Sequence, residues 1–227
     1  RIATALAVAG LYLLIFHRGG FRVRLRDLWI FLGSGVVSLL MFSVCYYSAM
    51  RYVSLSVASV LLYTAPIFVM LLSAALFREK ITPVKLIALA LAFGGCVCVS
   101  GIGSGAPIPS VGLLLGLGAG LFYALYSIFG RYAFLRGYDS WTLLFYTFLF
   151  CAAGCAFFAD WRAIVVAAAE PSFLPWTLAF GVTTGFLAYL FYSLGLERME
   201  SGRASILASF EPLVATLVGV IAFKEAL

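Results

Sequence analysis

A segment of this chain occurs twice, and Pro212 of the second copy follows Pro66 of the first by 146 residues. The first copy begins at Ala58 and ends with the triplet Phe77-Arg78-Glu79, and the second begins at Ala204 and ends with Phe223-Lys224-Glu225. The Ala-Ser pair, the proline and the Phe-basic-Glu triplet keep the same register in both copies. A period this long is not that of a solenoid repeat. It indicates that half of the chain is a duplicate of the other half.

The composition places these halves in a membrane. The chain is 64% hydrophobic and 11% charged, with a mean hydropathy of +1.11, and a soluble domain of this length could not bury so much apolar surface. Apolar runs of roughly 18 or more residues, long enough to cross about 30 Å of hydrocarbon, recur along the chain. They predict an all-α, multi-pass membrane protein with eight spans, at 2–16, 28–50, 54–77, 84–102, 111–131, 140–159, 173–196 and 202–224.

The repeat also predicts helices that this chain does not contain. Three pairs of spans correspond, namely 54–77 with 202–224, 28–50 with 173–196, and the short 2–16 with 140–159. The counterparts of 111–131 and 84–102 would lie before the first residue and after the last one. The whole protein should therefore have ten helices, five in each half. Because five is an odd number, the second half should be inverted relative to the first.

The two halves should meet in the uncharged linker 103–110, which is rich in glycine and proline. We expect residues 1–104 to form the first repeat, without its first helix and part of its second. Residues 105–227 should form the second repeat, without its last helix.

The basic residues predict which way the chain faces. Eleven of the fifteen lie in four alternate loops, at 17–27, 78–85, 131–139 and 197–203. Positively charged loops face the cytoplasm, so these four should share the cytoplasmic side of the cell membrane. The net charge of +6 therefore orients the protein in lipid and does not indicate a nucleic-acid partner.

The duplicated segment resembles the motif of EamA-type transporters, a branch of the drug/metabolite transporter superfamily. The residues that carry the resemblance are Tyr63-Thr-Ala-Pro66 with Phe77-Arg78-Glu79-Lys80, and Ser209-Phe-Glu211-Pro212 with Phe223-Lys224-Glu225. The resemblance covers essentially the whole chain. It implies a ten-helix carrier built from two inverted EamA repeats, which moves a small organic solute such as an amino acid or related metabolite, with export favoured by analogy.

The two prolines mark a candidate substrate pathway. A proline inside a helix removes a backbone donor and clashes with the turn before it, and the carbonyl groups that it frees in lipid must find partners or line a cavity. Pro66 and Pro212 therefore predict either a paired helix break at the membrane midplane, where inverted-repeat carriers bind substrate, or a kink that only shapes helix packing. The recurrence in both halves favours the break.

Glu211 is the acidic residue that lies deep within a span. An ionisable group at that depth is a functional candidate by default. It could bind protons, pair with an amine of the substrate, or satisfy the donors of the broken helix. We expect it to face the interior of the protein, with Ser209 on a neighbouring polar stripe. Ala65 occupies the corresponding position of the first half, so the architecture itself does not require this charge.

Tyrosines near the middle of the spans are further candidates, because a buried phenol needs a polar partner or cavity water. They are Tyr63, Tyr123, Tyr126 and Tyr189. Three smaller features have simpler interpretations. The glycines 112, 116 and 120 predict a helix-packing seam, His17 should lie at the surface, and Glu79 and Glu225 should pair with the neighbouring Arg78 and Lys224 or contact lipid headgroups.

The sequence predicts no catalytic residue, no cofactor and no metal site, and it carries no nucleotide-binding loop. The expected partners are a small-molecule substrate and the lipid bilayer, with protons as a candidate coupling ion, while the oligomeric state is not predicted. The alternative functions are an intramembrane enzyme, which would need a cluster of catalytic side chains, and a non-transporting scaffold or sensor, which would need long loops or a soluble domain.

Overall fold

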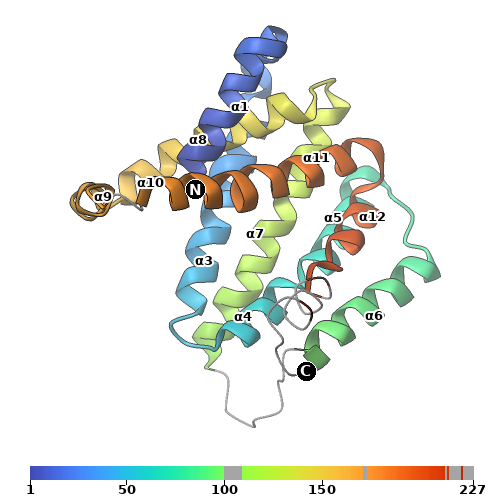
Figure 1. The fold of residues 1–227 in the computed structure, drawn as a ribbon. Helices are drawn as coiled ribbons and strands as arrows, with labels where there is room; N and C mark the ends of the chain where they lie inside the picture. Colours follow the sequence, from blue (N-terminus) through green and yellow to red (C-terminus); the bar gives the residue numbers. More distant parts are fainter. Residues whose placement is uncertain (100–108, 171–172, 213, 215–220, 222–227) are drawn as a thin grey trace. The chain divides into compact units, whose positions relative to one another are not determined.

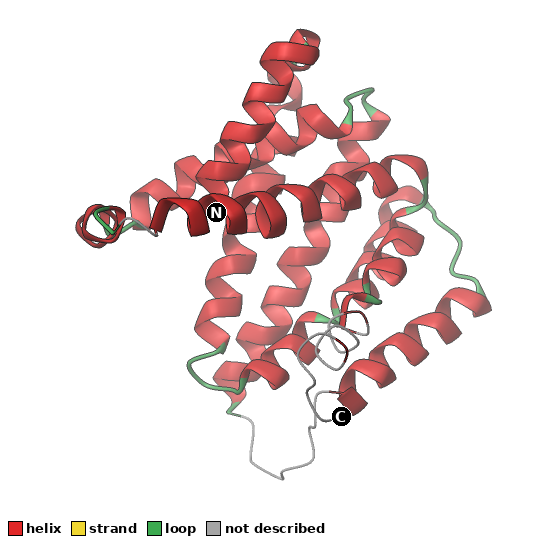
Figure 2. Cartoon of the chain, in the orientation of Figure 1, coloured by secondary structure: helices red, strands yellow, loops and turns green. Residues whose placement is uncertain are grey.

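The computed structural model describes residues 1–99, 109–170 and 173–212, together with residues 214 and 221. Within these ranges every regular element is a helix (Figure 2), which confirms the predicted all-α membrane fold. Five helices are long and apolar enough to cross a membrane, at Leu25–Ala49, Leu55–Phe77, Ser110–Leu135, Ser140–Phe158 and Phe173–Arg198. Two shorter apolar helices cover Ile2–Phe16 and Pro83–Gly95. Most of the 103–110 linker, and the end of the 202–224 span after residue 212 apart from residues 214 and 221, lie outside the described residues.

The chain divides into two compact units, and each unit draws on both predicted repeats. Unit 1 comprises residues 1–40 and 129–198, and unit 2 comprises residues 41–128 and 199–227. The division at residue 104 between two sequence repeats stays a prediction.

Unit 1 is built around α8 (Ser140–Phe158). Its other elements are α1 (Ile2–Phe16), η1 (Arg18–Phe21), η2 (Leu25–Asp27), α2 (Leu28–Leu32), η3 (Gly33–Leu40), α9 (Trp161–Ala168), α10 (Phe173–Phe180), η4 (Gly181–Leu187) and α11 (Ala188–Arg198). Helices α1, α2, η3 and α11 all pack against α8. A Cβ atom at Gly35 would lie 2.6 Å from the carbonyl oxygen of Thr147, so η3 and α8 meet backbone to backbone. The hydroxyl groups of Ser34 and Thr147 share a hydrogen bond of 2.7 Å at the same contact.

Unit 2 contains the first copy of the duplicated segment and the start of the second. Its elements are α3 (Met41–Ala49), α4 (Leu55–Leu62), α5 (Ala65–Phe77), α6 (Pro83–Val99), α7 (Ser110–Leu135, as far as residue 128) and α12 (Ser201–Ala208). Ser54 begins α4 by accepting a hydrogen bond from the Val57 amide through its side chain. Helix α12 packs against α5 and α6, and Figure 1 shows it lying beside α5.

The 160–172 loop contains a helix that the sequence did not predict. Helix α9 spans Trp161–Ala168 and starts after Asp160, whose carboxylate accepts the amide of Arg162 at 3.1 Å. Trp161 and Trp176, which the sequence identifies as candidate interfacial anchors, both have exposed side chains.

The glycine ridge on α7 is a packing seam, as predicted. Added Cβ atoms at Gly112, Gly116 and Gly120 would meet Val53, Leu61 and Thr64 at 2.6, 2.4 and 2.6 Å respectively. The seam therefore lets the backbone of α7 approach the chain just before α4, at Val53, and the end of α4, at Leu61 and Thr64.

Replacing Gly116 with Ala should destabilise the protein. The new methyl group would overlap both Cδ1 and Cβ of Leu61, and overpacking of this kind typically costs about 1–3 kcal/mol. Gly118 on the same helix is the matched control, because its added Cβ would lie at an ordinary 3.7 Å from Cys45 Sγ. Thermal melting in detergent should show a lower Tm for Gly116→Ala and an unchanged or higher Tm for Gly118→Ala, since alanine favours helix over glycine. Equal melting temperatures would contradict the seam.

Candidate functional site

The first predicted break is present in the structure, and the helix before it ends four residues ahead of Pro66. Helix α4 ends at Leu62, and α5 begins at Ala65 with Pro66 in its first turn. If the helix continued through Pro66, the proline ring would clash with the carbonyl group of Leu62. Proline is tolerated in the first turn of a new helix, because the N–H group that it lacks would have no intrahelical partner there. Thr64 closes the break by donating its hydroxyl to the Leu61 carbonyl at 2.6 Å.

The second break repeats this geometry in the other copy of the segment. Helix α12 ends at Ala208, again four residues before its proline, and a helical turn resumes at Glu211 and Pro212. Ser209 donates its hydroxyl to the Ser205 carbonyl at 3.1 Å. In each break a backbone amide donates a hydrogen bond to the carbonyl group three residues earlier, from Thr64 to Leu61 and from Phe210 to Leu207. Both breaks belong to unit 2.

One of the candidate tyrosines, Tyr123, lies near the first break. The ring of Tyr123 packs against the cluster formed by Ala65, Val69 and Ala124, and it also meets Phe42 edge-on with 5.3 Å between ring centroids. Ala65 directly precedes Pro66, so Tyr123 lies beside the residues that restart the helix.

The remaining tyrosines are more dispersed. Tyr63 is half-buried within the first break itself, and Tyr126 is almost fully buried on α7, one turn after Tyr123. Tyr189 belongs to unit 1, where its ring meets Phe148 edge-on with 5.8 Å between centroids. The structure therefore does not place all four tyrosines around one point within a single unit.

Ser209 and Glu211 occupy different environments. Ser209 is buried, with 9% of its surface exposed, whereas the Glu211 side chain is exposed within the described part of the chain. Residues 213 and 215–220, which follow Glu211, lie outside that part. The expectation that its carboxyl group faces the interior of the complete protein stays a prediction.

Two wide helical turns in unit 1 were not predicted. The spans that correspond in the two repeats, 28–50 and 173–196, each contain a π-helical segment, η3 (Gly33–Leu40) and η4 (Gly181–Leu187). In η4 the hydroxyls of Thr183 and Thr184 each donate at 2.7 Å to carbonyls one turn back, at Ala179 and Phe180. The signal available in the sequence was a mid-span Gly/Ser/Thr run in both copies. Such π-helical turns often accompany functional sites.

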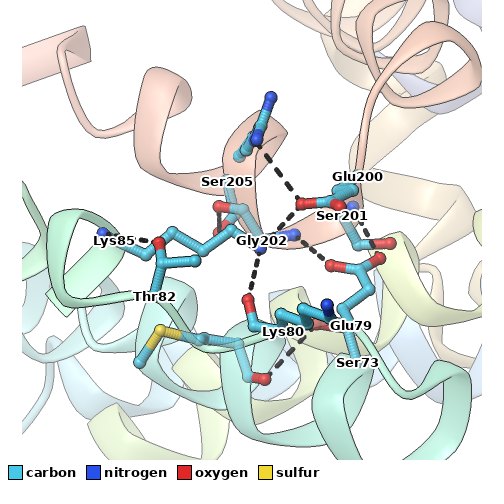
Figure 3. Close-up of polar contacts among 11 residues, drawn as sticks. Ser73, Glu79, Lys80, Thr82, Lys85, Glu200, Ser201, Gly202 and Ser205 are labelled. Atoms are coloured by element: carbon cyan, nitrogen blue, oxygen red, sulfur yellow. Dashed lines mark hydrogen bonds and ion pairs between the residues drawn. The ribbon is translucent and has the colours of Figure 1, made fainter.

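A polar cluster in unit 2 forms where α5 ends and α6 and α12 begin (Figure 3). Helix α5 is closed by Arg78, which adopts a left-handed conformation with φ of 57°, and this turn directs Glu79 toward α12. The carboxylate of Glu79 accepts the amides of Ser201 and Gly202 at 3.0 and 3.2 Å. The N-cap residue of α12, Glu200, makes no capping bond through its side chain. Glu79 therefore supplies the cap from another helix.

This geometry corrects the prediction for Glu79. The sequence favoured an ion pair with the adjacent Arg78 or a headgroup contact, but both carboxylate oxygens are engaged by the start of α12. The related prediction for Glu225 falls outside the described residues.

Lys85 completes the cluster from the first turn of α6. Its side chain is only 8% exposed, and its ammonium group donates to Glu200 Oε2 at 2.7 Å and to the Lys80 carbonyl at 2.9 Å. Arg203 approaches the same Glu200 oxygen at 3.4 Å. The hydroxyl of Ser201 is buried and has no hydrogen-bond partner among the described residues. The cluster thus joins the loops at 78–85 and 197–203, which the charge pattern places on one side of the membrane.

Contacts within unit 1 likewise bring two of the basic loops together. His17 Nε2 lies 3.1 Å from Asp139 Oδ2, which confirms a surface role for this histidine, and the amide of Arg24 donates to the Tyr138 hydroxyl at 3.2 Å. The loops 17–27 and 131–139 therefore lie together, as expected for loops on one face. Within the described ranges, no three His, Cys, Asp or Glu side chains are placed to hold a metal ion.

Comparison with known proteins agrees with this architecture. An uncharacterized transporter of Archaeoglobus fulgidus is 29% identical over 213 residues, which cover 92% of this chain and 74% of the relative. A second uncharacterized transporter of the same organism is 30% identical over 80% of this chain and 63% of its own length. YetK of Bacillus subtilis, also an uncharacterized transporter, is 23% identical over 99% of this chain and 70% of its own.

A solved crystal structure has the same fold. It superposes with a TM-score of 0.78 at 20% sequence identity, and the match covers 100% of this chain and 77% of that one. The EamA-like transporter family matches residues 2–101 and again residues 110–227. Since these two matches cover nearly the whole chain, the protein is a member of the EamA-like transporter family.

Proposed function

We propose that this protein is a secondary transporter that moves a small organic solute, an amino acid or a related metabolite, across the cell membrane. The observation that carries the proposal is the paired helix break at residues 63–64 and 209–210. Each break follows a helix that ends four residues before a proline, and each contains a hydroxyl side chain. Broken helices at equivalent places in two repeats are how inverted-repeat carriers expose backbone polar groups to a substrate.

The proposed pathway lies in unit 2, along α7 and the two breaks. Its residues are Pro66, Tyr63, Tyr123, Tyr126, Ser209, Glu211 and Pro212, and Tyr189 is a further candidate from unit 1. At the break, α4 turns its Leu61 and Leu62 carbonyls toward Gly120 of α7, where an added Cβ would lie 3.1 and 3.4 Å from them. The Leu61 carbonyl already accepts the Thr64 hydroxyl and amide, so in the proposal a substrate ammonium group would share or replace these donors at the break.

Alternating access between the two repeats would carry the solute across. The polar cluster of Glu79, Lys85 and Glu200 lies at the ends of three helices, outside their apolar parts. It would hold that end of the pathway closed and would open when the solute moves to the other side. Export and proton coupling are part of the proposal by family analogy and by the presence of Glu211 in the pathway.

The test is solute counterflow into sealed vesicles that contain the full-length protein. Vesicles are loaded with one unlabelled amino acid or metabolite from a panel and diluted into the labelled form, with and without a pH gradient. A carrier should give saturable uptake that depends on the loaded solute, and coupling to protons should make it respond to the gradient. Chemical conversion of the solute would instead favour an intramembrane enzyme. Folded protein with neither flux nor conversion for the whole panel would favour a scaffold.

A further inference from the structure

A basic cavity in unit 1 stands apart from the proposed pathway. It has a volume of about 440 Å³ and lies where α1 leads into α2 and where α7 leads into α8. Its walls come from the loop at 17–24 and from residues 136–142. At about 30 Å³ per molecule of liquid water, it has room for a hydrated anion.

Only some of the charged side chains that line the cavity have an ion-pair partner. Arg136 forms an ion pair with the buried Asp27, and His17 pairs with Asp139. Arg22 and Arg24 also line the cavity, are exposed, and form no ion pair with any described residue. The cavity therefore presents two arginines that have no ion-pair partner among the described residues.

Hydrogen bonds hold the walls of the cavity in place. The Tyr138 hydroxyl donates to Asp27 Oδ2 at 2.8 Å and accepts the Arg24 amide at 3.2 Å, so one phenol ties the two loops together. Burial of the ring and the proximity of Asp27 raise the pKa of Tyr138, which keeps the phenol protonated as a donor. On the opposite wall, the Thr142 hydroxyl donates to the Gly20 carbonyl at 3.2 Å. Tyr138 engages Arg24 through the backbone amide, and the Arg24 side chain forms no ion pair with a described residue.

The position of the cavity indicates the class of ligand. The loops that form it join helices at the ends of their apolar spans, which is the depth of lipid phosphates in a bilayer. Basic pockets at this depth between membrane helices bind anionic headgroups, and guanidinium groups match phosphate oxygens in geometry. We infer that this cavity is a binding site for a phosphate group, held by Arg22 and Arg24 and supplied by an anionic phospholipid or by free phosphate.

The experiment measures binding to the full-length protein in neutral detergent by native mass spectrometry. The probes are phosphatidylglycerol, phosphatidylcholine and inorganic phosphate. Each arginine near a lipid surface contributes about 1 kcal/mol, so Arg24→Gln should weaken binding of the anionic probe about fivefold, and Arg22→Gln with Arg24→Gln by roughly 25-fold. The matched control is Arg26→Gln, because Arg26 is exposed in the same segment but does not line the cavity.

The probes also distinguish the source of the phosphate. Preferential retention of phosphatidylglycerol over phosphatidylcholine, lost in the double variant, supports a lipid headgroup. Retention of inorganic phosphate alone, lost in the same variant, supports a soluble anion. The inference is wrong if the double variant binds every probe as the wild type does, or if Arg26→Gln weakens binding as much as Arg24→Gln. Folding is not at risk in these variants, since Arg24 contacts Tyr138 through its backbone amide.

Discussion

Replacing Glu79 with Ala is expected to lower the Tm of the purified protein by roughly 5–15 °C. The carboxylate accepts the amides of Ser201 and Gly202, which are both buried at the start of α12. Alanine would leave these donors without a partner, and an unsatisfied buried donor typically costs about 1–3 kcal/mol. For a chain of this size, 1 kcal/mol corresponds to about 2–4 °C in melting temperature.

Two variants separate this role from a general effect of substitution in the cluster. Ser201→Ala removes a buried hydroxyl that has no partner among the described residues, and it keeps the backbone amide that Glu79 caps. It should therefore melt at or above the wild-type temperature. Glu79→Gln retains one carbonyl oxygen and should melt between the wild type and Glu79→Ala. If Glu79→Ala and Ser201→Ala melt alike, the carboxylate does not cap α12.

The two helix breaks could be predicted because their cause is local. A proline acts on the carbonyl four residues before it, so Pro66 and Pro212 by themselves place the ends of α4 and α12. The membrane spans could likewise be predicted from apolar length alone. The structure adds the hydroxyl groups of Thr64 and Ser209, which close the breaks.

The cap that Glu79 provides could not be predicted, because it joins residues more than 120 positions apart. Read locally, Glu79 follows Arg78, and an ion pair between neighbours is the simplest expectation. Only the left-handed turn at Arg78 and the packing of α12 against α5 and α6 bring the carboxylate to Ser201. The π-helical segments were not predicted, although both spans carry a mid-span run of Gly, Ser or Thr. In η3 this run includes Gly35, which lies against the Thr147 backbone of α8, a contact between residues distant in the sequence.

Replacing Glu211 with Gln is expected to reduce solute flux at least tenfold while leaving folded protein in the membrane. The residue follows the second break directly, with Pro212 beside it, and the sequence predicts that it lies within a membrane span, where an ionisable group is costly. Hydrogen bonds to a charged group contribute about 1.5–3 kcal/mol, and 1.4 kcal/mol corresponds to a factor of ten. Loss of one such bond to a substrate amine would account for the expected reduction.

The pH dependence of flux identifies which role Glu211 performs. Glutamine has nearly the shape of a protonated glutamic acid but cannot release a proton. If Glu211 couples transport to protons, the solute flux of Glu211→Gln should therefore no longer respond to pH. A carboxyl group that only accepts the donors of the broken helix would be replaced well by glutamine, since the amide oxygen accepts the same bonds. Counterflow in vesicles over a range of pH, with Glu170→Gln in an exposed loop as the control, distinguishes these cases. A wild-type rate together with a wild-type pH profile in Glu211→Gln would remove Glu211 from the proposed transport mechanism. The paired break, with the hydroxyl groups of Thr64 and Ser209, would then be the remaining candidate for recognition of the solute.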